Sequence, residues 1–403
     1  MTEKHDVFTH DVLIVGGGLV GPSLAIALDR LGLETGLVEA TPAGVMPAVF
    51  DQRNLSFAAA TVNALTTLGV MAKLSAPTGL IRRIHVSRQG DFGRTRLEAA
   101  DYGREAFGQV VVARDFGEAL EARLSELKGL TRYRPARFIG LGGSREGSRS
   151  LRISDEQGER ELSARLLVAA DGTRSSLRDA LGIGTSEHDY RQVLFVARMR
   201  AEQAPDGTAY ERFGAQGPTA LLPRGDRHFG VVHGVASEQA EEVAALNDAA
   251  WTERIQNAFG WRVGRFLASG ERSAYPIIKT VAERTVAERA VLLGNAAQTI
   301  HPIGAQGFNL GLRDALTLAE LIGQSQDPGA SALLDRYAER RREDRQRTLE
   351  FSDGLARITG NASPLARPLR SLGLMAADNS AALQSMLVGG AMGFRGEVPE
   401  LCR

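Results

Sequence analysis

The chain has 403 residues, of which 43% are hydrophobic and 24% are charged, and its 48 basic and 48 acidic side chains cancel at neutral pH. This length suits two or three domains and the composition is typical of a globular protein, while the even charge balance gives no argument for a nucleic-acid partner. The one cysteine, Cys402, excludes a disulfide framework, a redox-active cysteine pair and a cysteine-based zinc site, and it favours a reducing compartment.

The N-terminal segment gives no targeting signal. Residues 1–11 are polar and acidic, unlike a signal peptide. No run of about 18 or more apolar residues occurs, so the sequence predicts no membrane-spanning helix. We therefore expect a cytoplasmic protein.

The first structural pattern is a strand, a glycine-rich loop, a helix and a second strand. An apolar strand is predicted over residues 11–15, a helix over residues 22–31 and a strand over residues 33–38, with the loop GGGLVG following the first strand. The second strand ends at Glu39, 18 positions after the last glycine of the loop. This is the G-x-G-x-x-G pattern of dinucleotide-binding folds in its required context.

Each residue of this pattern has a physical role toward an adenine dinucleotide. Gly16 permits the tight turn, Gly18 lets the backbone approach a pyrophosphate, and Gly21 lets helix and strand pack closely. The helix N-terminus presents unpaired N–H groups to the phosphates. Glu39 can accept hydrogen bonds from both ribose hydroxyls and would repel a 2′-phosphate, which favours FAD or NAD over NADP at this site.

The following residues alternate between helical and β patterns. After a loop over residues 41–53, we predict a helix over residues 56–68, β-structure over residues 80–113, and a helix over residues 115–127 with Asp115 as its N-cap. Arg53, at the end of the loop, could reach the pyrophosphate or could be a solvated surface charge. The residues alone leave both interpretations open.

The middle of the chain is predicted to be rich in strands. Residues 131–155 indicate strands joined by the turn GGSREGS, and residues 164–170 indicate a buried strand that ends at Asp171. A carboxylate in that position points into the crevice where ligands bind in parallel sheets. Residues 191–235 predict at least three strands of a mostly antiparallel sheet, and residues 237–259 a charged helix.

A second glycine-rich loop follows late in the chain. After a strand over residues 272–278, the apolar run 290–293 predicts a buried strand, and an amphipathic helix starts at about Asn309. The loop between them carries Asn295, His301, Pro302 and Gly307. Such loops are common sites, although a simple crossover turn fits the pattern equally well.

These elements predict an α/β fold. A Rossmann-like cofactor domain is assembled from three discontinuous segments, 1–80, 110–185 and 275–340. A β-rich domain, 81–109 and 186–274, is inserted between them, and residues 341–403 form a helical C-terminal region. Three distant segments that each end a strand with ligand-type residues suit a long, two-headed cofactor. The seven histidines show no metal-ligand spacing, so we predict no metal site.

Three motifs in order carry a resemblance to a known family. The segments GGGLVG, ADGTRSSLR and GNAAQTIHPIGAQGFNLG resemble the motifs of the FAD-dependent aromatic hydroxylases, the class A flavoprotein monooxygenases. The segments AYERFGAQGPTALLP, FGWRVG and RSAYP are similar to the ubiquinone-biosynthesis branch, above all to hydroxylases of 2-polyprenyl-6-methoxyphenol. Where the family commonly has aspartate and histidine, this chain has Asn295 and Gln298, as that branch does.

The resemblance implies an FAD-binding domain, an inserted substrate domain and a set of site residues. It assigns Gly16, Gly18, Gly21 and Glu39 to the ADP half of FAD, and Arg53 and Arg114 to the phosphates or the ribityl chain. It assigns Asp171 to FAD and to the segment linked with nicotinamide nucleotides, and Asn295 to the ribityl chain. It places Gly307, Phe308 and Asn309 at the isoalloxazine and Pro302 on the substrate side of the ring.

The resemblance also implies a reaction. NAD(P)H, bound transiently, reduces FAD, which reacts with O2 to a C4a-hydroperoxide that an electron-rich phenol attacks. An apolar pocket must exclude water; Phe213, Leu221, Leu222 and Pro223 either line it or are ordinary core. His301 is a candidate base or a structural residue. The substrate implied is a polyprenylated phenol, and other ubiquinone-biosynthesis proteins are candidate partners.

The weakly charged tail, residues 364–393, is expected either to touch the inner face of a membrane or partner proteins, or to pack against the FAD domain. Three alternatives to the main interpretation remain at this point. The chain could hydroxylate another aromatic compound, reduce isoprenoid double bonds without oxygen, or act as a non-catalytic flavoprotein partner in a biosynthetic complex.

Overall fold

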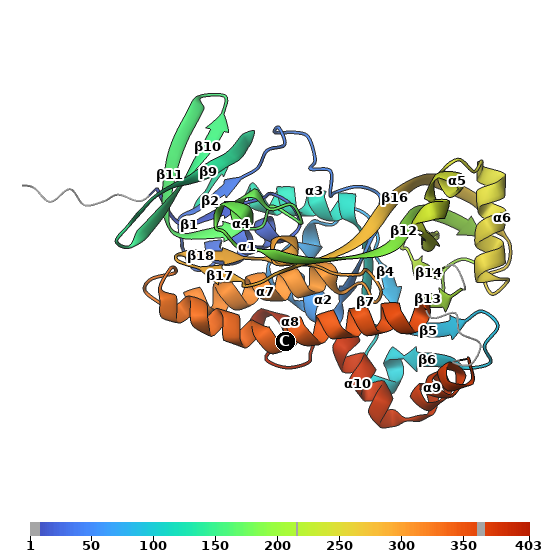
Figure 1. Cartoon of the computed structure of the whole chain (residues 1–403). Helices are drawn as coiled ribbons and strands as arrows, with labels where there is room; N and C mark the ends of the chain where they lie inside the picture. Colours follow the sequence, from blue (N-terminus) through green and yellow to red (C-terminus); the bar gives the residue numbers. More distant parts are fainter. Residues whose placement is uncertain (1–8, 215–216, 361–366) are drawn as a thin grey trace, which may run out of the picture.

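The computed structural model describes residues 9–214, 217–360 and 367–403, and it is built on two large sheets and one small sheet (Figure 1). The first sheet has the order β17-β18-β11-β1-β2-β8, with a hairpin that extends from β11. Its strands are β1 (His10–Val15), β2 (Thr35–Val38), β8 (Leu130–Tyr133), β9 (Ala136–Arg145), β10 (Ser148–Asp155), β11 (Gly158–Ala169), β17 (Val286–Ala287) and β18 (Ala290–Leu292).

The centre of this sheet is parallel. Strand β1 pairs in parallel with β2 and β11, and β11 pairs in parallel with β18. These strands are short apolar runs buried on both faces, which is typical of parallel sheets covered on two sides. The predicted strands over residues 11–15, 33–38, 164–170 and 290–293 are confirmed.

Helices α1 (Val20–Asp29), α3 (Ala113–Leu124) and α7 (Gln306–Ile322) share one hydrophobic core with this sheet. The long helix α8 (Ser331–Gly360) packs on the outer side of α7 (Figure 1). Helix α7 begins three residues before the expected start at Asn309. Helix α3 begins at Ala113, so the prediction that Asp115 is its N-cap was wrong. The amide of Ala113 donates to the carbonyl of Arg53 at 2.9 Å, which fixes the earlier start.

The second large sheet has the order β19-β16-β12-β15-β14-β13-β5-β6. Its strands are β5 (Arg83–Arg88), β6 (Arg94–Glu98), β12 (Thr185–Ala201), β13 (Thr208–Phe213), β14 (Pro218–Pro223), β15 (Phe229–Ala236), β16 (Phe266–Ala282) and β19 (Gln298–Thr299). Strands β12 and β16 are 17 residues long, and within the second sheet they extend from beside the first sheet to the far side of the molecule (Figure 1). The predicted antiparallel strands over residues 191–235 are confirmed, and the strand expected at 272–278 is longer.

Two helices cover one face of this sheet. Helix α6 (Asp248–Phe259) buries Trp251, Ile255 and Phe259 against it, and α5 (Ala240–Ala244) lies beside α6. The continuous helix predicted over residues 237–259 is therefore wrong. The chain breaks at Asn247, whose side chain caps α6 by accepting a hydrogen bond from the amide of Ala250 at 2.9 Å.

A small third sheet joins the two large ones. It has the order β3-β7-β4, formed by β3 (Asn54–Ala58), β7 (Gly108–Val112) and β4 (Gly79–Ile81). The helix predicted over residues 56–68 is wrong at its start, because residues 54–58 form β3 and helix α2 spans Ala59–Thr67. The partner that makes this segment a strand, β7, lies some fifty residues later in the chain, so no local pattern reveals it.

The C-terminal helices α9 (Arg367–Asn379) and α10 (Ala381–Ala391) lie at the β5–β6 edge of the second sheet (Figure 1). The hydroxyl of Thr95 on β6 donates to the carbonyl of Leu374 on α9 at 2.9 Å. Packing of the tail against the FAD domain was expected as one alternative, and its last residues do so, because the amide of Ala60 on α2 donates to the carbonyl of Met392 at 3.0 Å. Helix α9 packs on β6, and residues 364–366 of that tail lie outside the described ranges. Over those ranges, no helix combines the length and hydropathy needed to cross a bilayer.

Candidate active site

The loops that the sequence singled out meet at one edge of the first sheet. Val15 at the end of β1 pairs with Val38 and Ala169, and Ala169 pairs with Leu292. The loops that follow these strand ends carry Gly16 after β1, Glu39 after β2, Asp171 after β11 and Gly294 after β18. Because the carboxyl ends of parallel strands form the ligand crevice of such sheets, the structure places these loops at one candidate site.

The three glycines of the first loop differ in what surrounds them. A Cβ atom on Gly16, whose φ is +116°, would lie 2.3 Å from the carbonyl oxygen of Ala170, and one on Gly21 would lie 2.0 Å from the carbonyl oxygen of Gly16. A Cβ on Gly18 would meet only Val49, at 3.8 Å. The fold itself therefore requires glycine at 16 and 21. At Gly18 the open side of the backbone leaves room for a ligand, as a pyrophosphate site demands.

Glu39 closes the other end of this loop. Its Oε2 accepts a hydrogen bond from the amide of Gly17 at 2.8 Å, and its Oε1 accepts one from the amide of Thr41 at 2.6 Å. The carboxylate is thus held at the carboxyl end of β2, next to the glycine loop. This is the position from which it can accept hydrogen bonds from ribose hydroxyls.

The late loop packs directly on the first one. A Cβ on Gly294, whose φ is +55°, would lie 2.8 Å from the side chain of Val20, and one on Gly311 would lie 3.0 Å from the Cα of Gly294. Helices α1 and α7 can approach this closely because both positions are glycine. Asn295 is exposed, and its side chain hydrogen-bonds to none of the residues that the structure describes. Its amide is free to bind a hydroxyl group.

The N-terminus of α7 is open. Its N-cap, Ala305, has a φ of +52° and no side chain that can cap the helix. A Cβ on Gly307 would meet nothing within 4 Å. The first amides of α7 and the positive end of its dipole therefore face unfilled space, which suits the negative charge of a reduced flavin. Pro302 is exposed beside them, and its carbonyl accepts a hydrogen bond from Ala305 at 2.8 Å.

Phe308 and Asn309 turn their side chains inward, away from this open end. The ring of Phe308 packs against Phe57 and Phe116, with centroids 5.3 and 5.2 Å away. The Asn309 side chain accepts hydrogen bonds from the amide of Ala58 and the hydroxyl of Thr61, and it donates to the carbonyls of Ser56 and Ala305. All four bonds are 2.7 to 2.9 Å long. These side chains join α7 to β3 and α2, and only their backbone atoms remain for a flavin.

Arg53 lies at the junction of the two large sheets. Its guanidinium binds Asp51 through two nitrogens, at 2.8 and 2.7 Å, and lies 4.4 Å from the ring centre of Tyr275 on β16. Burial opposes ionisation of Asp51, but hydrogen bonds from Arg53 and Tyr275 outweigh it and lower the pKa of the carboxyl. The amide of Arg114 donates to the carbonyl of Asp51 at 3.0 Å, so the structure brings both predicted arginines to this loop.

Asp171 has a local role that the sequence did not reveal. Its carboxylate accepts hydrogen bonds from the hydroxyl of Ser175 and, at 3.1 Å, from the amide of Leu177. It therefore holds the turn that leads into helix α4 (Ser176–Ala180). Burial dominates its environment and raises the pKa of Asp171. The spacing D-x-x-x-S just before a short helix was the available signal for this turn.

His301 and Gln298 are structural residues of the late loop. The imidazole of His301 is buried, its Nδ1 accepts from the amide of Ile303 at 3.2 Å, and burial lowers its pKa to about 4. Gln298 is buried as well; it donates to Asp314 and accepts from Arg345, both at 2.8 Å. A neutral histidine whose Nδ1 is already occupied is a poor general base at neutral pH.

The four residues expected in the substrate pocket lie on different sides of β14 and β13. Leu221 is fully buried in the core beneath α6, so its side chain does not reach the face that turns toward β3. Leu222 points to the opposite face and packs with Ile81 and other apolar residues of the third sheet and α10. Phe213 shares that face with Pro218 and Leu222 by register. Pro223 is buried where β14 crosses β4.

The face of the second sheet that carries Leu222 is directed at the cofactor loops. The hydroxyl of Tyr275 donates to Asp51 at 2.5 Å, and Arg224 donates to the side chain of Asn54 at 2.9 Å. A Cβ on Gly230 would lie 2.1 Å from the same asparagine. Strand β3 therefore lies between the second sheet and the N-terminus of α7.

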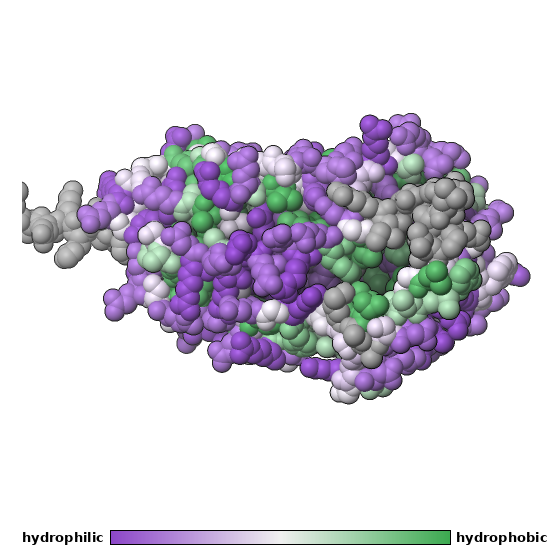
Figure 2. Space-filling view, turned by 60° about the horizontal axis from the view of Figure 1, so that its bottom comes forward, coloured by the Kyte–Doolittle hydropathy of each residue, from purple (hydrophilic) through white to green (hydrophobic). Residues whose placement is uncertain are grey.

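The face of the molecule formed by α8 and the C-terminal helices is hollowed, with apolar side chains around the hollow (Figure 2).

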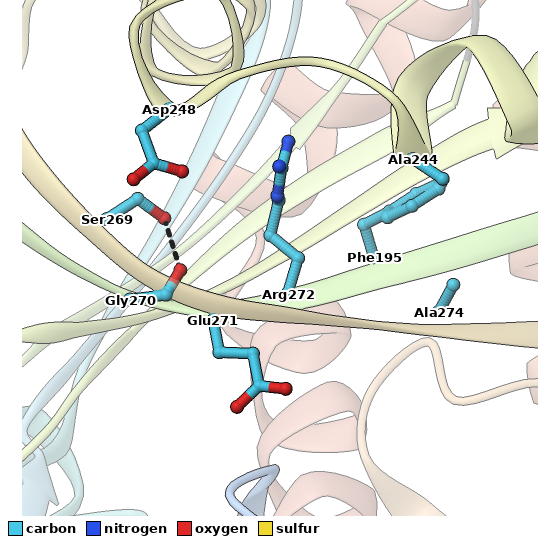
Figure 3. Close-up of a pocket in the computed structure, with 8 residues that line it drawn as sticks. All are labelled: Phe195, Ala244, Asp248, Ser269, Gly270, Glu271, Arg272 and Ala274. Atoms are coloured by element: carbon cyan, nitrogen blue, oxygen red, sulfur yellow. Dashed lines mark hydrogen bonds between the residues drawn. The ribbon is translucent and has the colours of Figure 1, made fainter.

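Two further pockets lie on the α5–α6 side of the second sheet. The pocket drawn in Figure 3 has a volume of about 370 Å³, and its polar residues are Asp248, Ser269, Glu271 and Arg272. Arg272 also lies over the ring of Trp251, with 5.5 Å to the ring centre. The other pocket, of about 530 Å³, is lined by Thr219, His233 and Arg254 among others. The sheet separates both from the cofactor loops, so neither belongs to the site.

Comparisons with known proteins agree with this geometry. The family described as FAD binding domain matches residues 9–352. The chain is 34% identical to ubiquinone hydroxylase UbiL of Rhodospirillum rubrum, over 95% of this chain and 89% of the relative. It is 29% identical to 3-demethoxyubiquinol 3-hydroxylase of Escherichia coli, over 95% and 98% of the two chains.

Solved structures share the fold. The p-nitrophenol 4-monooxygenase PnpA of Pseudomonas putida superposes with a TM-score of 0.79 at 17% identity, over 96% of this chain and 98% of that one. The probable FAD-dependent monooxygenase pqsL of Pseudomonas aeruginosa superposes with a TM-score of 0.74 at 21% identity, over 91% and 99%. At these identities the superpositions show a shared fold.

Proposed function

Because the chain belongs to the FAD-dependent aromatic monooxygenases, the family that carries this FAD-binding domain, we propose that it hydroxylates the ring of a polyprenylated phenol in ubiquinone biosynthesis, using NAD(P)H and O2. The observation that carries the proposal is the similarity to a ubiquinone hydroxylase over 95% of the chain. The convergence of the glycine loop, Glu39, Asn295 and the open end of α7 on one crevice supports it.

The residues at this crevice fit FAD. The open side of Gly18 admits a pyrophosphate, Glu39 accepts from the ribose, and the exposed amide of Asn295 binds a ribityl hydroxyl. The first amides of α7 would favour negative charge on a reduced flavin held beside them. The bound flavin supplies the redox chemistry, taking two electrons from NAD(P)H and activating O2. The protein holds the phenol ring over Pro302 and keeps water away with apolar side chains such as Leu222.

Oxygen-dependent turnover of a prenylated phenol tests this function. The purified protein should show the absorption of bound flavin, and 2-geranylphenol should stimulate its oxidation of NAD(P)H. With ¹⁸O2, the product should contain one labelled oxygen atom. Product formation without oxygen would indicate a reductase, and a flavin-containing protein that never oxidises NAD(P)H with any phenol would indicate a non-catalytic partner.

We further propose that the C-terminal helices touch the membrane from which a polyprenylated substrate must come. Four large apolar side chains are exposed in this region: Phe92 (70%), Leu372 (56%), Met375 (42%) and Leu383 (40%). The first three lie close together, because a Cβ on Gly93 would lie 2.3 Å from the carbonyl oxygen of Ser371, and residues 372 and 375 share one face of α9. Helix α10 also contributes Val388 and Met392 to the apolar cluster with Leu222.

Vesicle flotation tests the membrane contact. The triple variant Leu372→Ser, Met375→Ser, Leu383→Ser should lose most of its binding to phospholipid vesicles, because it removes exposed apolar area. The control is Trp261→Ser, which removes a side chain that is 68% exposed elsewhere on the surface. Equal flotation of the wild type and the triple variant would contradict the contact, and loss of a partner protein instead of lipid would assign the surface to that partner.

A further inference from the structure

A carboxyl group lies on the inner face of the second sheet, in the middle of β13. Tyr210 pairs with Leu221, and both pack beneath α6, where the ring of Tyr210 meets Phe259 at 5.4 Å between centroids. Successive side chains of a strand point to opposite faces. Glu211 therefore points away from α6, to the face that is directed at the cofactor loops.

The surroundings of Glu211 on that face are apolar. Its neighbours by register are Val86 on β5 and Ala220 on β14, and Val232 on β15 follows Ala220. Beyond them lies the apolar cluster that joins the sheet to β7 and α10. Its members include Ile81, Leu97, Phe107, Ala209, Val388 and Met392, with Leu222 packed against them.

The charged groups near this face are engaged elsewhere. Arg88, at the end of β5, lies 3.9 Å from Asp91. Asp378 on α9 accepts a hydrogen bond from the amide of Arg96 at 2.7 Å. Strands β6, β14 and β15 add no charged side chain in register with Glu211, and α10 adds Gln384. Among the residues that the structure describes, none forms a hydrogen bond or an ion pair with Glu211.

Burial alone raises the pKa of Glu211 to about 7. The side chain is nonetheless only partly buried by accessible area. The carboxyl group is therefore surrounded by protein but keeps part of its surface open to solvent. A carboxyl group without a partner in apolar surroundings lowers the stability of the fold, and groups of this kind cluster at functional sites.

We propose that Glu211 accepts a hydrogen bond from the phenolic hydroxyl of the substrate and takes its proton as the ring is oxygenated. This inference deepens the proposed function and rests on it. Strand β3 connects the face that carries Glu211 with the cofactor loops. Its Asn54 contacts this face of the sheet, and Asn309 of α7 donates a hydrogen bond to its Ser56 carbonyl. A phenol bound at this face would present its hydroxyl to β13 and direct its ring toward the N-terminus of α7.

The step balances with the reactants of the proposed function. The phenolic O–H bond breaks, its proton moves to the Glu211 carboxylate, and its electron pair enters the ring. The enriched ring carbon forms a bond to one oxygen atom of O2, and the other oxygen leaves as water with the two electrons of NAD(P)H. The ring carbon then loses its hydrogen as a proton, which restores aromaticity, and the carboxyl proton returns to the ring oxygen.

The variant Glu211→Gln tests this role in the FAD-loaded enzyme with 2-geranylphenol. Its kcat should fall roughly 100- to 10,000-fold, the usual contribution of a general base. In the wild type, kcat/KM should rise with pH through an apparent pKa of about 7. That rise should persist in Glu211→Asp and vanish in Glu211→Gln. Binding of 2-geranylphenol, measured by calorimetry, should change by no more than roughly threefold, since the amide oxygen still accepts a hydrogen bond.

Glu253→Gln is the matched control, because Glu253 is exposed and lies on α6, in the second pocket on the other side of the sheet. It should behave as the wild type at every pH. If the wild type hydroxylates 2-geranylphenol and Glu211→Gln follows the same pH profile with similar kcat, the role of Glu211 is overturned and the proposed function stands. If the wild type neither binds nor hydroxylates a prenylated phenol, both proposals fall.

Discussion

Asn309 and Thr61, 248 residues apart in the sequence, are joined by a hydrogen bond of 2.7 Å in which the hydroxyl donates to the amide oxygen. The same oxygen accepts from the amide of Ala58, and the amide nitrogen donates to the carbonyl of Ser56. One buried side chain thereby fixes β3 and α2 against the open end of α7. The distance between the open end of α7 and the second sheet depends on this side chain.

Replacing Asn309 by alanine should lower the free energy of unfolding by about 1–3 kcal/mol for each buried backbone group left without a partner. It should also weaken FAD binding, because α7 loses its connection to β3. Denaturant titration and FAD fluorescence measure the two effects. Asn257→Ala, at an exposed position on α6, is the control and should change neither.

Two glycines of the first loop should respond differently to a methyl group. Gly21→Ala places a Cβ 2.0 Å from the carbonyl oxygen of Gly16 and should destabilise the apoprotein by about 1–3 kcal/mol. Gly18→Ala has free space around its Cβ and should leave the melting temperature of the apoprotein unchanged. Because we propose that the pyrophosphate approaches through that space, Gly18→Ala should weaken FAD binding by roughly tenfold or more. Normal FAD affinity in Gly18→Ala would argue against this placement of the cofactor.

Asn295 offers a change that should improve cofactor binding. A carboxylate makes stronger hydrogen bonds to a hydroxyl than an amide does, so Asn295→Asp should tighten FAD binding by about 1 kcal/mol, or roughly fivefold. Asn295→Ala should weaken it. Both follow from FAD titration of the apoprotein. If all three proteins bind FAD equally, Asn295 does not touch the ribityl chain.

Arg341 neutralises two carboxylates between α7 and α8. It lies 2.7 Å from Asp314 and 2.7 Å from Asp344, and its side chain is 3% exposed. Arg341→Met leaves the buried carboxylate of Asp314 without this partner, while Asp344 keeps Arg313 at 2.7 Å, and should reduce the free energy of unfolding by about 3–5 kcal/mol. The neighbouring Arg342→Met removes an exposed ion pair with Glu339 and should leave stability nearly unchanged. Equal unfolding midpoints in the two variants would contradict a structural role for the buried cluster.

Glu211 should make stability depend on pH in a defined direction. Its pKa rises from the ordinary value of 4.5 to about 7 in the folded protein. Between these values the unfolded chain has lost a proton that the folded chain retains, so stability falls as pH rises from 4.5 to 7 and remains lower above that. Melting temperatures of the wild type and Glu211→Gln should therefore coincide near pH 4.5 and diverge toward pH 7, with the variant more stable. Parallel curves would mean that the carboxyl is solvated or paired.

The sequence was informative wherever local pattern and ligand chemistry coincide. The loop after β1, the strand before Asp171 and the loop before α7 carry glycine or acidic residues in fixed positions after short apolar runs, and all three lie at the expected edge of the sheet. The ubiquinone branch was indicated by Asn295 and Gln298, although Gln298 proves to be bound within the protein.

What the sequence could not predict depends on partners far away in the chain. Strand β3, for example, exists because β7 pairs with it. Leu221 and Leu222 are adjacent and equally apolar, so only the position of α6 decides which of them faces the cofactor. Glu211 lies between Tyr210 and Arg212, and the alternation of that strand gives no sign of which face is covered.

The contact between Asn309 and Ala58 spans 251 positions, and this has a consequence for biosynthesis. A ribosome completes the glycine loop first, but Gly294 and Gly311, which pack against Val20 at its end, are made more than 270 residues later. The nascent chain must carry an unfinished nucleotide fold through most of translation, with apolar surface that chaperones can recognise. Cofactor loading is therefore a late event, and a chain truncated before α7 should leave the ribosome without flavin.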